Sequence, residues 1–301
     1  MVLKFGALTS DKDAMKKDIV KRILYTEAET MLEMGRAVVV QGIDQLSYGM
    51  TFPTVERLDP QQVTEGTIAD YQKLSWAEFY GSMKKFQDII LTTDEANARN
   101  QMNIQMPYTM TAIARGLAWA KDKEIKTVVK AAAGKTVSVS AYWDDPVSSN
   151  LPKDIAEAMA FALSTTYMNV VDLKGGILFY PAELWAFMNQ PARPNEYTML
   201  GMSPIEWVQQ KYGVTFIPTR QLDAEAMLVF PGQWTALHMI YMGGDIPLVE
   251  YAREYGTGNK FYVTQMYSTL AMPNSTTDRL KNNRIILLSG VCQTRATRAS
   301  S

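Results

Sequence analysis

The stretch from Met50 to Ala96 restricts the fold of this chain more than any other feature of the sequence. It has mixed polarity throughout and contains no apolar run dense enough to build a core of its own. Three short segments within it have the composition of strands, and proline and glycine residues punctuate them. These segments are residues 52–55, 63–66 and 86–91, with Pro53, Pro60 and Gly66 within or between them. We therefore predict a long two-stranded arm.

Such an arm is too long for the body of its own subunit. Two strands of about 18 residues, at about 3.3 Å per residue, span roughly 60 Å. A compact chain of 301 residues has a radius of gyration of only about 19 Å. Because an isolated two-stranded ribbon is marginally stable in water, the arm needs a surface to lie on, and we expect that surface to belong to a neighbouring copy. The alternative is that these segments are ordinary strands folded back into a sheet of their own subunit.

The composition indicates a folded globular protein and excludes several classes. Apolar residues make up 47% of the chain, which is enough for a substantial core. The 30 lysine and arginine residues nearly cancel the 31 acidic residues, so the net charge gives no reason to expect a dedicated nucleic-acid binder or a polybasic membrane protein. A single cysteine, Cys292, excludes an intramolecular disulfide. With neither a signal-peptide core nor a run of about 18 apolar residues, we expect a reducing, soluble compartment.

Hydrophobic periodicity predicts a series of helices and strands along the rest of the chain. An amphipathic helix is expected over residues 10–34 and a longer one over residues 107–132, with Pro107 in an early turn and Gly134 at the stop. The apolar stripe of the longer helix comprises Met110, Ile113, Ala114, Leu117, Ala118, Ile125, Val128 and Val129. The other predicted elements are strands 37–40, 176–180, 214–217, 227–230, 235–241 and 260–272, the last joined by a strand at 284–288, and helices 154–167, 181–188 and 203–213, the last with a Ser203–Glu206 capping box.

The residues that most enzymes use are sparse or poorly placed in this sequence. His238, the only histidine, falls in a strand-like segment and makes a common zinc site improbable. Asp144 and Asp145 precede a proline in a stretch typical of a turn, although paired carboxylates can bind a divalent ion. Residues 256–260 contain glycines but lack the following helix that a phosphate site needs. We expect no enzyme activity, no cofactor and no metal site; an unrelated enzyme that uses only carboxylates is the alternative.

The order of these elements resembles that of shell proteins with the HK97-type capsid fold. An N-terminal helix, an extended arm, a long helix, a mixed α/β region and late long strands follow one another as in that family, over most of the chain. The segments that carry the resemblance are 52–53, 63–66, 71–74 and 90–95 for the extended loop, 154–158, 176–181 and Trp185 for the axial domain, and 214–219 and 226–230 for its central strands. The resemblance implies an α+β fold with an N-terminal arm, an extended E-loop hairpin, a long spine helix, a peripheral domain and an axial domain.

The resemblance also implies how the chain is divided. The expected parts are 1–36 for the N-terminal arm and helix; 37–49, 93–134 and 260–292 for the peripheral domain with the spine helix; 50–92 for the E-loop; 135–259 for the axial domain; and 293–301 for the C-terminal tail.

The function that the resemblance implies is that of a major capsid protein of a tailed virus. The chain would assemble with itself, as hexamers and pentamers, into an icosahedral shell around double-stranded DNA. Assembly would take place in the host cytoplasm, without a membrane, and portal, scaffold or cementing proteins are further implied partners. The alternative with the same fold is an encapsulin shell that encloses cargo enzymes, because the helix that begins after Ser10 also resembles the start of an encapsulin.

Three sets of residues are candidates for contacts in such a shell. The candidates for contacts between subunits on the E-loop are Tyr71, Leu74, Trp76, Phe79 and Tyr80. The candidates for sequence-independent contacts with DNA phosphates are Lys16, Lys17, Lys21, Arg295 and Arg298, with a solvated helix face and a solvated tail as the alternative. Some members of the family join subunits through lysine and asparagine side chains, and Lys73, Lys84, Lys85, Asn282 and Asn283 have the necessary groups.

Overall fold

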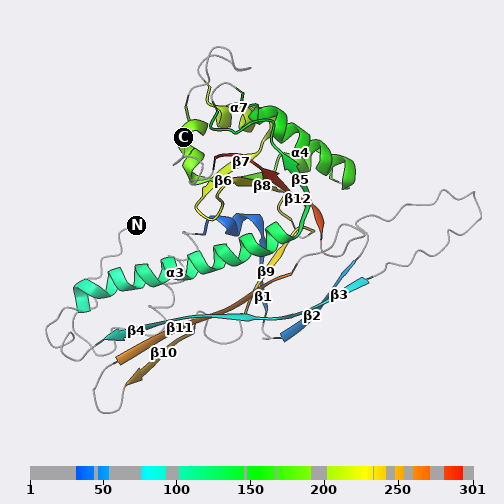
Figure 1. The fold of residues 1–301 in the computed structure, drawn as a ribbon. Helices are drawn as coiled ribbons and strands as arrows, with labels where there is room; N and C mark the ends of the chain where they lie inside the picture. The colour runs from blue at the N-terminus through cyan, green and yellow to red at the C-terminus, as the bar shows by residue number, and fades with distance from the viewer. Residues whose placement is uncertain are drawn as a thin grey trace, which may run out of the picture.

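The structure is a computed structural model that describes eleven ranges of the chain. These ranges are residues 32–43, 47–53, 76–92, 102–145, 148–166, 168–190, 202–232, 234–241, 248–253, 260–271 and 281–293. The helix predicted over residues 10–34 lies almost entirely outside them. Figure 1 shows a compact upper part of strands and helices above a long lower sheet, with one long helix between the two.

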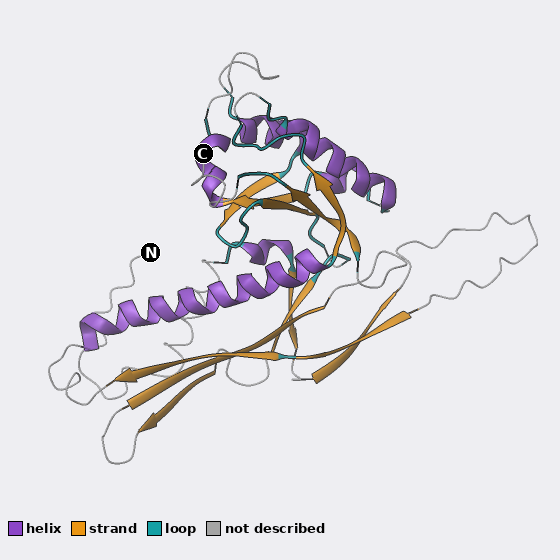
Figure 2. Cartoon of the chain, in the orientation of Figure 1, coloured by secondary structure: helices purple, strands orange, loops and turns teal. Residues whose placement is uncertain are grey.

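The upper part is built around a mixed five-stranded sheet. Its strands lie in the order β5-β12-β8-β6-β7, and both end pairs, β5 with β12 and β6 with β7, are parallel. Helices cover the side of this sheet that faces away from the long helix (Figure 2). The strands are β5 (Ala133–Ser138), β6 (Ile177–Pro181), β7 (Thr215–Thr219), β8 (Glu225–Val229) and β12 (Asn282–Ser289); the helices are α4 (Leu151–Thr165), α5 (Val170–Leu173), η3 (Ala182–Leu184), α6 (Trp185–Met188) and α7 (Pro204–Tyr212).

Both faces of this sheet are buried, which explains why its central strands are almost continuously apolar. Successive side chains of a strand point to opposite faces, and along β8 Leu228 belongs to one core cluster while Met227 belongs to the other. The first cluster includes Ile155 of α4 and Val208 of α7. The second includes Ile125 of the long helix. The upper sheet is therefore packed between the surface helices and the long helix.

The lower sheet contains five strands around the long strand β11. Its path is β1-β9-β11-β10, and β4 also pairs with β11. β1 and β9 are parallel, whereas β4, β9 and β10 are all antiparallel to β11. The long helix α3 runs along this sheet (Figure 1). The elements are η2 (Met34–Ala37), β1 (Val39–Ile43), β4 (Lys84–Thr92), α3 (Met102–Ala131), β9 (Leu237–Tyr241), β10 (Leu248–Arg253) and β11 (Lys260–Ala271).

A separate two-stranded ribbon leaves this sheet. It consists of β2 (Ser47–Pro53) and β3 (Trp76–Ser82), which are antiparallel and place Ser47 opposite Ser82 and Pro53 opposite Trp76. Figures 1 and 2 show the ribbon pointing away from the body of the molecule. The described part of the predicted arm is therefore extended, but only β2 and β3 are two-stranded. The predicted strand segment 86–91 lies in β4, which pairs with β11 of the subunit's own sheet, as the alternative expected.

The sequence signals predicted for both ends of α7 are confirmed, whereas the predicted start of α4 is wrong. The Ser203 hydroxyl accepts from the backbone N–H of Glu206, the Glu206 carboxylate accepts from that of Ser203, and Gly213 ends the helix in the left-handed region with φ 70°. Helix α4 begins at Leu151, earlier than predicted. The Asn150 side chain caps it by accepting from the backbone N–H of Lys153 at 3.2 Å.

Three expectations about elements are wrong. Helix α3 begins at Met102, so Pro107 lies within the helix rather than in an early turn. Gly134 lies in β5 instead of closing α3, in a place where the backbone of Asn283 leaves no room for a side chain. Strand β12 does not join β11; it pairs with β5 and β8, because its apolar residues fill the two-sided core of the upper sheet.

The strand pairing also connects parts of the chain that the predicted division separates. Strands β9 and β10 come from the predicted axial range, yet they pair with β1 and β11 of the lower sheet. Strand β12 comes from the predicted peripheral range and lies in the upper sheet. The domain boundaries stay a prediction. Among the described helices, none has the length and apolar character needed to cross a membrane.

Candidate assembly surfaces

The ribbon of β2 and β3 is the first candidate surface for assembly. Within the described ranges, its two strands pair only with each other. β3 runs on into β4 with only Met83 between them, and β4 pairs with β11 from Thr92 to Lys84. The run from Trp76 to Thr92 is about 50 Å long at the rise of a strand. Its second half is fixed in the lower sheet, and its first half extends outward with β2.

The structure locates three of the five E-loop candidates. Trp76, Phe79 and Tyr80 lie in β3, on the extended ribbon. Tyr71 and Leu74 lie outside the described residues. The contribution of these five residues to contacts between subunits stays a prediction.

The five candidates for DNA contact all fall outside the described part of the chain. They are Lys16, Lys17, Lys21, Arg295 and Arg298. Their role also stays a prediction.

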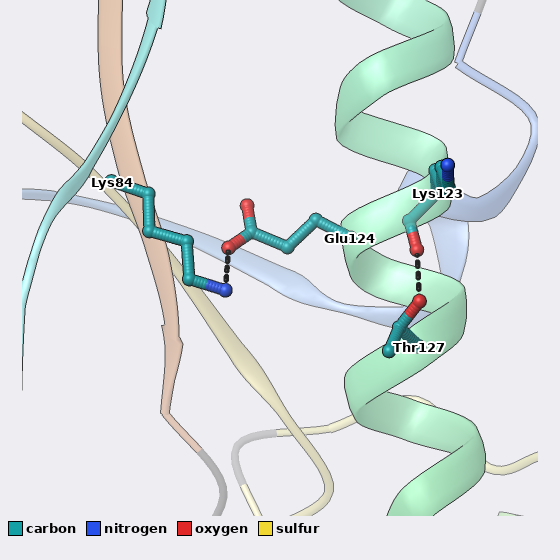
Figure 3. Close-up of polar contacts among 4 residues, drawn as sticks. All are labelled: Lys84, Lys123, Glu124 and Thr127. Atoms are coloured by element: carbon teal, nitrogen blue, oxygen red, sulfur yellow. Dashed lines mark hydrogen bonds and ion pairs between the residues drawn. The ribbon is translucent and has the colours of Figure 1, made fainter.

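An ion pair joins the long helix to the root of the ribbon. The Lys84 Nζ lies 3.0 Å from the Glu124 Oε1, which connects the first residue of β4 to α3 (Figure 3). The lysine side chain is 63% exposed, but the glutamate side chain is only 7% exposed. The nearby Thr127 hydroxyl donates to the Lys123 carbonyl at 2.7 Å and stays within the helix. The pair therefore connects the start of β4, next to the ribbon, to α3, in addition to the pairing of β4 with β11.

A second carboxylate on α3 holds the segment that precedes β1. The buried Asp122 accepts the backbone N–H of Glu33 on Oδ2 and that of Met34 on Oδ1, both at 2.9 Å. The Glu33 carboxylate in turn accepts the backbone N–H of Arg220 at 3.1 Å. These bonds hold Glu33 and Met34 between α3 and the end of β7.

Burial raises the pKa of Asp122 from 3.8 to about 6, although the two backbone N–H groups oppose this shift. The nearby charges are Glu33, which also raises the pKa, and Lys121, which lowers it. Because the folded state binds the proton more tightly than the unfolded state, the stability that this group contributes is complete below pH 3.8 and is lost as the pH rises through about 6.

Asp122→Asn is expected to remove this pH dependence. Relative to the substituted chain, the unmodified chain should lose about 2 kcal/mol of unfolding free energy between pH 4 and pH 7, because the asparagine amide cannot ionise. Urea unfolding across that range measures the difference. A difference between the two chains that stays constant across that range would contradict the raised pKa.

The role of Asp122 was not predicted, although the sequence contains a pattern that indicates a buried carboxylate. The apolar stripe predicted for α3 continues through buried residues such as Ala118 and Ile125, and the intervening Lys121 and Asp122 are buried too. A charged residue on an apolar helical stripe indicates a buried polar contact. Its partners could not be named, because they lie 88 and 89 residues away in the chain.

One proposed crosslinking residue has a clear structural role. The Asn282 side chain is buried, and its Nδ2 donates to the carbonyls of Trp234 at 2.8 Å and Thr235 at 3.2 Å. Its Oδ1 accepts the backbone N–H of Arg284 at 2.9 Å. These bonds connect the start of β12 to the turn before β9. Within the described ranges, no group of three or more histidine, cysteine, aspartate or glutamate side chains is placed to bind a metal ion.

Comparison with known structures finds proteins of similar fold at low sequence identity. No protein-family description matches the sequence, and no curated protein matches it. A virus-like particle from Pyrococcus furiosus is similar in structure with a TM-score of 0.63 and 11% identity, over 90% of this chain and 98% of that one. The capsid of the Myoviridae phage XM1 has a TM-score of 0.58 and 12% identity, over 84% of this chain and 90% of that one.

An encapsulin from Synechococcus elongatus is also similar, with a TM-score of 0.53 and 12% identity, over 85% of this chain and 87% of that one. The likeness extends over most of each chain, so it includes both sheets and the long helix rather than one motif. The chain therefore has the HK97-like fold of shell proteins.

Proposed function

We propose that this chain is the major capsid protein of a tailed virus, a structural subunit that assembles with itself into a closed icosahedral shell around double-stranded DNA. The observation that carries the proposal is the extended ribbon of β2 and β3, which the described part of the subunit leaves without a partner sheet. A two-stranded ribbon is marginal in water, so contact with a neighbouring copy would stabilise it. The role is structural rather than enzymatic, and the particle is the virion.

In this proposal the parts of the subunit have separate tasks. The ribbon and the chain that joins its strands form the E-loop, which lies over the adjacent subunit. Helix α3 is the spine, the upper sheet with its helices is the axial part that meets at the shell's axes, and the lower sheet is the peripheral part. Many weak repeated contacts would then close the shell, as expected for identical subunits related by symmetry. The bonds of Asp122 and the Lys84–Glu124 pair would hold the two extended segments in fixed directions.

The second candidate is an encapsulin shell, which the structural likeness to the Synechococcus elongatus encapsulin favours. Both proposals require self-assembly, and they differ in what the particle contains. We favour the capsid because several of the similar structures are capsids of phages, among them phage XM1 and the cyanophage P-SCSP1u.

Size-exclusion chromatography followed by negative-stain microscopy of the purified chain tests the proposal. We expect closed particles hundreds of ångströms wide. A monomer or small oligomer at high concentration would overturn both shell proposals. Nucleic acid inside the particles would support the capsid, and a co-purified enzyme inside them would support the encapsulin and overturn the capsid.

A further inference from the structure

Helix α3 carries an uneven distribution of charge. Its 30 residues include the basic residues Arg115, Lys121, Lys123, Lys126 and Lys130, and only two acidic ones. Both acidic side chains turn toward the rest of the subunit. Asp122 is buried and accepts from the backbone near η2, and Glu124, only 7% exposed, pairs with β4. The part of α3 that faces solvent is therefore left with positive charge alone, although the whole chain has a net charge of −1.

Four residues on this side of α3 form what we call the α3 stripe: Arg115, Trp119, Lys123 and Lys126. Their spacing of four, four and three residues places them on one face of the helix. Arg115 and Lys123 are exposed, Lys126 is half-buried and Trp119 is 49% exposed. Tyr108 lies about two turns before Arg115 on the same face and is 77% exposed.

The cations of the α3 stripe differ from the other basic residues of the helix. Lys121 is buried, and Lys130 forms an ion pair with Glu225. Among the described residues, Arg115, Lys123 and Lys126 take part in no ion pair. Within the described part of the chain, no ion pair neutralises these three charges.

We propose that the α3 stripe binds the phosphate backbone of double-stranded DNA. From Arg115 to Lys126 the stripe is about 17 Å long at the helical rise, and a straight row of cations of this length can follow several phosphates along one strand. Lysine acts as a mobile point charge and arginine as a planar fork, and both bind phosphate oxygens. Such contacts do not depend on base sequence.

The inference rests on the proposed function, because it names where a shell subunit would meet its contents. It is independent of the E-loop and of the basic residues at the two ends of the chain. A second copy of the chain could bind to the same positive charge, and the measurement of particle formation separates this case from DNA binding.

The test is fluorescence anisotropy with a labelled 30-base-pair DNA and the full-length chain at several salt concentrations. Arg115→Gln, Lys123→Gln and Lys126→Gln are combined in one variant. Removing three phosphate contacts should weaken binding at low salt by about tenfold or more. It should also reduce the slope of log affinity against log salt by about 3. DNA binding at the stripe should change the tryptophan fluorescence of the unmodified chain. This change should be absent in a Trp119→Phe variant.

The matched control removes three exposed cations elsewhere, as Lys153→Gln, Lys174→Gln and Lys211→Gln. It should bind DNA within about twofold of the unmodified chain and keep its salt slope. Equal binding by the two triple variants, or no DNA binding by the unmodified chain, would overturn the proposal.

Particle formation by the same variants is measured separately by microscopy. If the stripe variant fails to assemble but binds DNA normally, the face contacts a second copy and the DNA proposal is wrong. If the unmodified chain forms no particles, the proposed shell function fails, whereas a selective loss of DNA binding in the stripe variant would still support the stripe as a DNA site.

Discussion

Replacing residues 54–75 with the dipeptide Asn-Gly is expected to give a folded subunit that no longer forms particles. The register places Pro53 directly opposite Trp76, so a two-residue turn can close the ribbon at this point. The replacement keeps all residues of β2, β3 and both described core clusters, and the fold of these parts should therefore survive. The variant lacks the part of the arm that we propose lies over a neighbouring subunit. Loss of that contact at every subunit should abolish closed particles at concentrations where the unmodified chain forms them.

Circular dichroism and thermal unfolding show whether the shortened subunit is folded, and microscopy shows whether it assembles. A second variant, in which residues 54–75 are replaced by a glycine-serine linker of equal length, separates chain length from side-chain contacts. We expect this variant to fail in assembly too. Normal particles from the shortened chain would show that the arm is not needed for assembly.

Gly134→Ala is expected to destabilise the subunit by about 3 kcal/mol, a large effect for one methyl group. A Cβ at this position of β5 would lie 2.6 Å from the Asn283 Cα and 2.7 Å from the Asn282 carbonyl oxygen. These atoms belong to the backbone of the neighbouring strand, so a change of rotamer cannot relieve the clash. The two strands would have to separate where β5 and β12 pair and where Asn282 is fixed by its buried bonds.

Urea unfolding measures this effect, and Gly232→Ala is the control. No atom lies within 4 Å of a Cβ built at Gly232, so the control should change stability by less than about 0.5 kcal/mol. Equal midpoints for the two variants would mean that β5 and β12 are not packed closely at Gly134.

The sequence predicted well those elements whose signals are local. The capping box at Ser203 and the left-handed Gly213 define α7 within eleven residues, and both are present. The periodic apolar residues of α3 also predicted its buried face, including Ile113, Leu117 and Val129. Helix periodicity and caps depend on neighbours within a few turns, so one sequence is enough to read them.

The pairing of strands could not be predicted in the same way. Strand β12 is apolar on both faces, and this pattern shows that it is buried without naming its partner. Its parallel neighbour β5 is about 150 residues away in the chain. The role of Gly134 could not be predicted for the same reason, because the backbone that leaves no room for a side chain there belongs to the distant Asn283. A glycine between a helix and a strand has the same sequence signature whether it ends the helix or admits a neighbouring backbone.

The candidate site was predicted in outline only. The extended ribbon was expected, and Trp76, Phe79 and Tyr80 lie on it. The carboxylates of Asp122 and Glu124 were not expected, because their partners come from distant segments that no local pattern connects.

Met83 separates the two ladders of the continuous run formed by β3 and β4. It lies between the last residue paired with β2, Ser82, and the first residue paired with β11, Lys84. Within the described residues of this run, Met83 belongs to neither ladder, so a change in its backbone dihedral angles need not break a ladder hydrogen bond. In the proposed shell, identical subunits at sites of different curvature could differ at this residue while both ladders stay paired.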